Sequence, residues 1–208
     1  MNKYLNQICE APTKAEQGRP KIAYKRIQET DSFYNLSKLG QQELPQALQR
    51  RQSGRPPRLR ISRETLVNGQ PEKARIVKIP ISNLHIYNPG TPKPFDCRIS
   101  INLEVNLNKP NLHFDALIEG QTQVEVDRRK NRLSYKHLNT FSIDLTKVEM
   151  DGLAPTHELE LEVDSNLLRT QMALMVEGRP NAYGDVVSGF LDNATFLMRA
   201  RPPPQARG

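Results

Sequence analysis

The chain has few cysteines, no long hydrophobic run and no visible export signal. Its 208 residues include two cysteines, Cys9 and Cys97, which lie far apart and show no metal-ligand spacing. This argues against a disulfide scaffold and a zinc site, and it fits a reducing compartment. No stretch approaches ~18 consecutive apolar residues, as a transmembrane helix would, and residues 1–15 contain no apolar segment of a secretory signal. We therefore expect a soluble intracellular protein with no membrane partner.

The sequence also lacks the glycine-rich loops that bind nucleotides in two large fold families. Neither Gly-x-x-x-x-Gly-Lys nor Gly-x-Gly-x-x-Gly occurs, so a P-loop or a Rossmann site is not supported. Hydrophobic residues make up 37% of the chain, which is below the usual ~45–50%. A chain of this length still buries about 70% of its unfolded surface, so we expect a core despite that shortage.

Positive charge is in excess, and the excess lies in the first third of the chain. The formal net charge is +7 overall, +8 for residues 1–75 and −1 for residues 76–208. A basic segment of this kind binds polyanions such as nucleic acid; the alternative is a solvated, partly disordered loop. Residues 40–58 are rich in Gln, Arg and Pro, and we expect them to be flexible. Residues 1–198 are predicted to form one domain, followed by a disordered tail at 199–208.

From about Arg58 onward, polar and apolar residues alternate with a period of two, which is typical of strands with one apolar face. The predicted strands are residues 59–62, 75–79, 98–105, 122–126, 128–135, 141–145 and 156–163. Near the end the period lengthens and predicts two helices, one capped by Asp164 or Ser165 and ending near Gly178, the other over residues 183–198. Residues 2–10 suggest a third, short helix. The predicted fold class is α+β, a mostly antiparallel sheet with helices packed outside.

Three predicted strands have polar faces that differ in their charge, whereas the polar face of an ordinary sheet carries mixed charges. Alternate side chains on one face of a strand lie ~6.6–6.8 Å apart, so each set shares a face. The sets are Arg98, Ser100, Asn102 and Glu104; Arg128, Lys130, Arg132 and Ser134; and Glu158, Glu160 and Glu162. The last face is entirely acidic, and like charges at this spacing repel unless a cation lies among them.

The acidic face suggests a metal site, because hard divalent cations such as Mg²⁺ and Mn²⁺ prefer carboxylate oxygens. The alternative is that these glutamates form a solubilising edge strand. The basic face offers three groups that bind phosphate, two of them able to form bidentate pairs. A curled sheet would bring both faces to one interior, where a metal and a phosphate could bind together, as in phosphoryl transfer. Such a polar interior also accounts for the low apolar fraction.

Four segments resemble signatures of a known family. They are His157-Glu-Leu-Glu-Leu-Glu, Arg98-Ile-Ser-Ile-Asn-Leu-Glu, Lys130-Asn-Arg-Leu-Ser-Tyr and Phe141-Ser-Ile-Asp-Leu-Thr-Lys-Val. The chain is similar here to the fungal, metal-dependent RNA 5′-triphosphatases, the beta subunits of yeast-type mRNA capping enzyme, which are triphosphate tunnel metalloenzymes. The similarity runs from about residue 2 to residue 198, in the family's order. It implies an antiparallel β-barrel that forms a tunnel and removes the γ-phosphate from triphosphate-ended nascent mRNA, the first step of 5′ capping.

The resemblance also implies roles for individual residues. Glu162 would touch a Mg²⁺ or Mn²⁺ ion directly, while Glu158 and Glu160 would act on the metal through water or neighbouring bases. Glu104 would orient the attacking water. The implied phosphate-binding bases are Arg60, Lys78, Arg128, Lys130 and Arg132, and of these Lys130 and Arg132 join Glu104, Glu158 and Glu160 in the implied catalytic set. The acidic residues Asp31, Asp96 and Asp144 would pair with tunnel bases or serve as plain structural residues, and Arg98 is a further structural partner.

The chain departs from the family pattern at two places. Ser142 stands where one family pattern has a basic residue, so one wall loses a charge. The family's first catalytic strand, with a Glu-x-Glu pair, lies upstream of Met1; the similar Glu125-Val-Asp127 is in the wrong place to replace it. We therefore expect a barrel incomplete at its N-terminal strand, with strand edges that invite pairing with another chain, and weak or no activity of the 208-residue chain.

The implied setting is the nucleus, with triphosphate-ended RNA as substrate, mRNA guanylyltransferase as partner, a possible homodimer and no DNA specificity. Two alternatives stay open: a catalytically impaired RNA-binding or scaffold remnant of the family, and a related tunnel enzyme that acts on polyphosphate or nucleotides.

Overall fold

A computed structural model describes residues 23–49, 57–64, 72–87, 95–120, 122–137 and 139–199. Seven strands form one antiparallel sheet in the order β4-β3-β2-β1-β5-β6-β7. The strands are β1 (Ala23–Asn35), β2 (Arg58–Glu64), β3 (Glu72–Ile86), β4 (Cys97–Asn106), β5 (Arg128–His137), β6 (Phe141–Glu149) and β7 (Thr156–Val163). The helices are α2 (Lys38–Gln42), α3 (Gln46–Gln49), α4 (Phe114–Leu117), α5 (Ser165–Val176) and α6 (Tyr183–Arg199).

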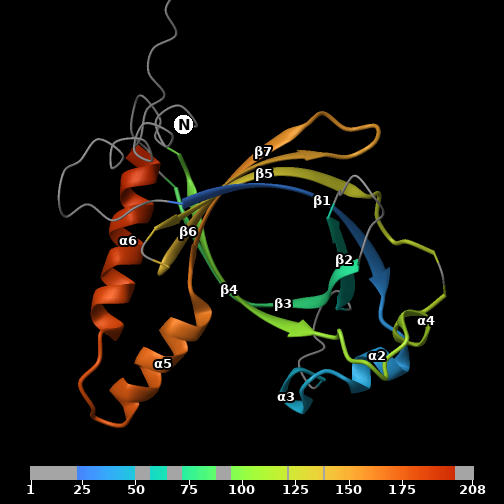
Figure 1. The fold of residues 1–208 in the computed structure, drawn as a ribbon, viewed down its shortest axis with the longest axis horizontal. Coiled ribbons are helices and arrows are strands. Elements are labelled where there is room, and N and C mark those ends of the chain that lie inside the picture. Colours follow the sequence, from blue (N-terminus) through green and yellow to red (C-terminus); the bar gives the residue numbers. More distant parts are fainter. Residues whose placement is uncertain are drawn as a thin grey trace, which may run out of the picture.

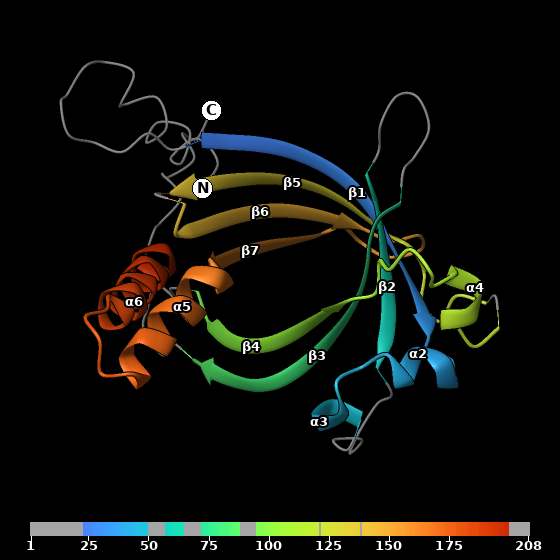
Figure 2. The same cartoon turned by 60° about the horizontal axis from the view of Figure 1, so that its bottom comes forward.

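The sheet curls around a central space, and the helices lie outside it (Figure 1). Its edge strands are β4 and β7 among the described strands. Helices α2, α3 and α4 gather below one side of the curled sheet, while α5 and α6 lie together at the opposite side, as Figure 2 shows. The predicted architecture, a mostly antiparallel barrel with helices outside, is therefore confirmed.

The hydrophobic core lies on the outer side of the sheet rather than at its centre. Leu59 of β2 is paired in register with Val77 of β3, and both are fully buried. They pack with Leu36, Leu44 and Leu117, which come from the chain around α2 and α4. The opposite face of the same strands carries Arg60, Ser62 and Lys78. The alternation of the sequence thus places apolar side chains under the helices and polar side chains inside the curl.

A register shift between Pro80 and Ser82 interrupts the pairing of β3 with β4. Proline has no backbone donor, and within a sheet it is confined to such irregular positions or to edges. The extra residue bends the strand and changes which positions face inward. Lys78 before the shift and His85 after it lie opposite Glu104 and Arg98 respectively.

The two C-terminal helices form where the sequence predicts them. The side chain of Asp164 accepts a hydrogen bond of 2.7 Å from the backbone N–H of Leu167 and so caps α5, and Gly178, with φ of 68°, follows its end. Helix α6 packs its Gly189 against the ring of Phe141 in β6. At its other end, the carbonyl of Met198 accepts a 3.4 Å hydrogen bond from Phe95, just before β4. No helix in the described part of the chain is long and apolar enough to cross a membrane.

Two strand predictions are wrong. Residues 122–126 form no strand; one backbone bond, from Val124 N–H to the carbonyl of Phe33, ties this segment to β1. The sequence alternates there, but this single backbone bond to β1 does not make a ladder. The other error is an omission, because β1 was not predicted. Its centre, Thr30-Asp-Ser32, is polar on both faces, so the apolar alternation that marks a strand is missing.

The remaining predicted segments lie partly outside the described residues. The helix predicted at residues 2–10 and most of the predicted tail are among them. The segment 40–58, predicted to be flexible, begins inside α2 and contains α3, while residues 50–56 lie outside the described residues. Its flexibility stays a prediction.

Candidate active site

The acidic and basic strand faces point into one cavity. The cavity measures about 2220 Å³ and occupies the interior of the curled sheet. The guanidinium of Arg128 in β5 donates a 3.0 Å hydrogen bond to the Glu158 carboxylate in β7, which joins the two faces directly. Every predicted site residue lines this cavity: Arg60, Lys78, Glu104, Arg128, Lys130, Arg132, Glu158, Glu160 and Glu162. The shared interior that the sequence predicted is therefore present.

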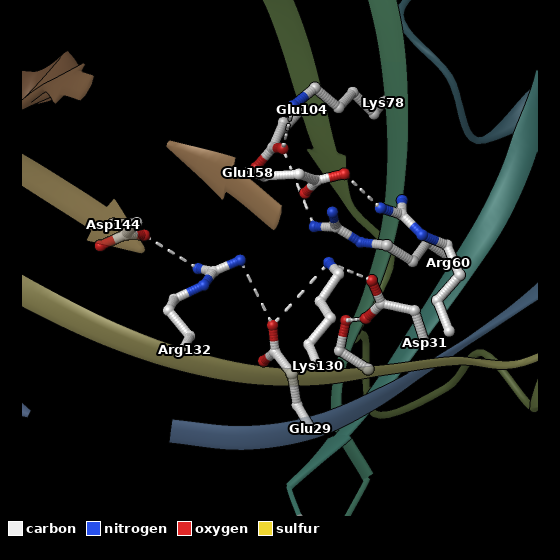
Figure 3. A network of polar contacts seen from close by, with 11 residues as sticks. Glu29, Asp31, Arg60, Lys78, Glu104, Lys130, Arg132, Asp144 and Glu158 are labelled. Atoms are coloured by element: carbon white, nitrogen blue, oxygen red, sulfur yellow. Dashed lines mark hydrogen bonds and ion pairs between the residues drawn. The ribbon is translucent and has the colours of Figure 1, made fainter. Parts of the chain in front are cut away.

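Glu104 lies between two bases of neighbouring strands. Its Oε1 is 3.8 Å from Arg60 Nη2 and 3.8 Å from Lys78 Nζ (Figure 3). Both separations exceed hydrogen-bond length. The two bases are therefore held near the carboxylate by charge while their donors stay available to another anion.

Lys130 is buried, with 7% of its surface exposed, and it lies against carboxylates of β1. It forms an ion pair with the fully buried Asp31, and Glu29 Oε1 is 4.0 Å from its Nζ. Ser62 donates a 2.6 Å hydrogen bond to Asp31. Burial raises the pKa of Asp31, but the charge of Lys130, its hydrogen bond and that of Ser62 outweigh burial, so the pKa lies below the ordinary 3.8.

Arg132 bridges two strands of the cavity wall. One guanidinium nitrogen is 3.1 Å from Asp144 Oδ2 in β6, and the other is 3.5 Å from Glu29 Oε1 in β1 (Figure 3). Burial lowers the pKa of Arg132, but Asp144, Glu29 and the two nearby glutamates of β7 raise it above its ordinary value. Arg132 therefore stays charged, and its ion pairs with Asp144 and Glu29 fix the position of its side chain.

Glu160 and Glu162 differ from the other carboxylates of the cavity, because neither forms an ion pair with any described residue. Burial against the cavity wall raises the pKa of Glu162 above its ordinary 4.5, and the negative charges of Glu160 and Asp144 raise it further. The Oδ1 atom of Asp144 is buried and has no hydrogen-bond partner among the described residues. This corner of the cavity thus holds three carboxylates whose negative charge Arg132 and Lys78 offset only in part.

The donor set in this corner fits a hard divalent cation. Carboxylate oxygens are the preferred ligands of Mg²⁺ and Mn²⁺, and Mg²⁺ at phosphate sites is held by one or two carboxylates together with phosphate oxygens and water. A closed cage of protein ligands is absent, since no three His, Cys, Asp or Glu side chains of the described residues are grouped to hold a metal ion. Glu160 and Glu162 therefore suit a cation that takes its remaining ligands from a phosphate and from water.

The structure adds Glu29 to the predicted residues. Its carboxylate reaches both Lys130 and Arg132. The signal was in the sequence, since Glu29-Thr-Asp31 places two acidic side chains on one face of a strand. It was missed because the segment was not predicted to be a strand.

Other predicted residues lie away from this network or pair elsewhere. Asp96 and Arg98 line the end of the cavity where β4 begins. Glu125 forms an ion pair with Arg58, and Asp127 accepts a 2.7 Å hydrogen bond from Ser32, so neither replaces the acidic strand β7.

Comparison with known proteins assigns the chain to a family. The family model described as mRNA capping enzyme, beta chain, matches residues 1–202. The chain belongs to this family. It therefore has the function of an RNA 5′-triphosphatase, a hydrolase of mRNA processing that acts in capping. No curated protein sequence matches the chain.

Two solved structures of a triphosphatase from S. pombe resemble the chain. One is the Pct1 RNA triphosphatase in complex with the Spt5 CTD, with a TM-score of 0.72 and 27% identity. The other is Pct1 RNA triphosphatase, with a TM-score of 0.70 and 26% identity. Each match covers 97% of this chain and 67% of the Pct1 chain. The curled sheet is thus the triphosphate tunnel fold of this capping-enzyme family.

Proposed function

We propose that this cavity is where the chain removes the γ-phosphate from triphosphate-ended nascent mRNA, with a bound Mg²⁺ or Mn²⁺ ion. The observation that carries the proposal is that the acidic strand β7 and the basic strand β5, separated in the sheet by β6, turn their charged faces to one interior, where Arg128 contacts Glu158 at 3.0 Å. Phosphoryl transfer depends on positioning the triphosphate and on neutralising its negative charge. The basic face can bind the phosphate oxygens, and the acidic face can hold the cation.

The basic side chains of the cavity have different roles, which follow from their exposure to solvent. Lys78 is 45% exposed and Arg60 22% exposed, and both lie beyond hydrogen-bond length from Glu104. They are the groups best placed to donate to phosphate oxygens. Lys130 and Arg132 provide positive charge at fixed positions in the cavity wall. Ion pairs with Glu29, Asp31 and Asp144 hold their side chains in place.

The cation would be held by Glu160 and Glu162, with Asp144 beside them and Glu158 linked to Arg128. When bound, it would neutralise charge on the phosphate that is transferred. Glu104 is accessible, with 46% of its side chain exposed, and we propose that it orients the water that attacks the phosphate.

The setting of the reaction is proposed on the same basis. We infer a nuclear location, cooperation with an mRNA guanylyltransferase and a possible homodimer. Pct1 is described in complex with the Spt5 CTD, and we extend this to a proposed contact of the chain with an Spt5 CTD.

One observation favours a second candidate function, which is RNA binding without catalysis. No three metal-ligating side chains of the described residues are grouped to hold a metal ion. A cavity that keeps its bases but cannot retain the cation would bind a triphosphate end without cleaving it.

Phosphate release from triphosphate-ended RNA with Mn²⁺ separates the two functions. Glu160→Ala is expected to lower the rate by about 10²–10³-fold, the loss typical of removing one electrostatic group of an active site. Glu177→Ala is the matched control, because Glu177 follows α5 and pairs with the exposed Arg179, and neither residue lines the cavity. Unchanged release in Glu160→Ala would contradict the assignment of the cavity, and RNA binding without any release by the wild type would favour the second function. Hydrolysis of inorganic polyphosphate in preference to RNA would indicate a third.

A further inference from the structure

An exposed pair of stacked aromatic rings lies at one end of the cavity. The rings of His85 and Tyr87 have centroids 6.3 Å apart and an interplanar angle of 14°. Tyr87 is 75% exposed, so the pair is not part of a core. A flat ring with a free face is available to stack on a planar ligand.

The strand pairing places His85 on the inward side of the sheet. His85 and Arg98 lie opposite each other in register, and both line the cavity. Tyr87 lies directly after the end of β3, and its ring stacks on that of His85. Phe95, 52% exposed, also lines this end. Along β3, His85 lies about 20 Å from Lys78, from the rise of an extended strand.

Aromatic side chains beside a guanidinium are the means by which proteins hold single-stranded nucleic acid. Bases stack on the rings with little sequence preference, and Arg contacts the backbone or stacks as well. Another part of the cavity lining carries the ion pair of Arg58 with Glu125. The part of the cavity beside His85 thus has the chemistry of a nucleobase site.

We propose that the His85–Tyr87 pair is a subsite for a nucleobase near the 5′ end of the RNA, with Arg98 on the adjoining backbone phosphate. The inference rests on the proposed function, because a triphosphate held among Arg60, Lys78 and Lys130 directs the following nucleotides out of the cavity. The subsite makes the chain bind a triphosphate-ended RNA more tightly than a bare tripolyphosphate, without selecting the base.

Binding of two ligands tests the subsite. A short 5′-triphosphate RNA and inorganic tripolyphosphate are titrated into the full chain without divalent cation, so that neither is cleaved. Tyr87→Ala is expected to weaken RNA binding about tenfold, within the range for loss of one stacked base, and to leave tripolyphosphate binding unchanged. Tyr87→Phe should keep wild-type RNA binding, because it keeps the ring. Tyr24→Ala is the control, since Tyr24 is 63% exposed but lies on the face of β1 opposite to Glu29.

A fluorescence measurement reports the stacking itself. The sequence has no tryptophan, so Tyr87→Trp introduces a single indole at the subsite and Tyr24→Trp a single indole on the outer face. RNA should quench the first indole and not the second, and tripolyphosphate should quench neither.

The outcomes distinguish the subsite from the proposed function. Equal weakening of both ligands by Tyr87→Ala, or no weakening of either, would overturn the subsite while the phosphate site stands. A wild-type chain that does not bind tripolyphosphate would instead overturn the phosphate site. If the phosphate site is overturned, a 5′-hydroxyl RNA that quenches the indole at position 87 would still support the subsite as an RNA contact. If that RNA does not quench the indole, the subsite is overturned as well.

Discussion

Asp31 and Lys130 form a buried ion pair in the wall of the cavity, and neither has appreciable contact with solvent. Transfer of two charges from water into a wall of this kind costs free energy that their attraction repays only when both partners are present. Ser62 satisfies one further lone pair of Asp31. The pair therefore fixes the position of Lys130 and makes the structure sensitive to loss of either charge.

Asp31→Asn is expected to lower the free energy of unfolding by about 3–5 kcal/mol at pH 7, because Lys130 is left buried without its main partner. The pKa of Asp31 is lowered in the folded state. Its contribution is thus complete well above pH 3.8 and is lost as the pH falls through the folded-state pKa. Urea unfolding between pH 2 and pH 7 should therefore show a weaker acid dependence in the variant.

Asp151→Asn is the control for this experiment. Asp151 also forms an ion pair, with Arg129, and its pKa is lowered first by the hydrogen bond from Arg129. The pair lies in solvent, where such contacts add little. Equal losses of stability in the two variants would contradict the special role of the buried pair.

Most residues of the cavity could be predicted from the sequence, since alternation alone places Glu158, Glu160 and Glu162 on one face. Individual ion pairs could not. That Arg132 joins Glu29 to Asp144 depends on which strands are neighbours, and strands far apart in sequence become neighbours only through the fold.

At the scale of the elements, the short helix α2 is held close to α4 by a glycine. An added Cβ at Gly40 would lie 2.5 Å from the carbonyl oxygen of Leu117 and 2.8 Å from a methyl carbon of Leu36. These distances are shorter than van der Waals contact, and the first atom belongs to the backbone. The packing of α2 on the core cluster therefore requires glycine at this position.

Gly40→Ala is expected to lower the free energy of unfolding by about 1–3 kcal/mol, the usual cost of overpacking. Gly184→Ala, near the start of α6, meets no atom within 4 Å and should raise stability by up to about 1 kcal/mol, because alanine favours helix. Thermal unfolding of the two variants checks the pair. If Gly40→Ala were as stable as Gly184→Ala, the close approach of α2 to Leu117 would be wrong.

The two strand errors have different causes. Alternation of polar and apolar residues marks a strand that has one buried apolar face. It does not mark a strand whose two faces are both polar, one toward the cavity and the other toward packed neighbours. In β1 the buried Asp31 and Ser32 point to opposite faces. In residues 122–126 polar and apolar residues alternate as in a strand, but one backbone hydrogen bond joins this segment to the sheet. The local pattern therefore predicts a strand that long-range pairing does not form.

At the scale of the whole molecule, the curled sheet has β4 as an edge strand among the described strands. Its outer face carries Ile101, 61% exposed, and Leu103, 38% exposed. Leu84 of β3 lies on the same face and is 58% exposed. Unpaired edges with apolar side chains pair readily with other chains, and we expect the chain to self-associate as its concentration rises.

Ile101→Lys should shift the chain toward monomer in analytical ultracentrifugation, because a charge on an edge strand opposes edge pairing. Leu84→Lys changes the same face one strand away from the edge and should leave the association largely intact. Equal effects of both substitutions would indicate association through the face, and no effect of either would contradict a role for this region.

The sequence by itself determined the polar faces of β4, β5 and β7, the resemblance to the family and the chemical character of the site, because alternation and short motifs are local properties of the chain. The tertiary structure alone decided that those faces share one cavity, that Glu29 belongs to the site, and that aromatic rings mark one end of it. These depend on sheet order and curvature, and both arise from pairings between segments far apart in the chain, which no local pattern encodes.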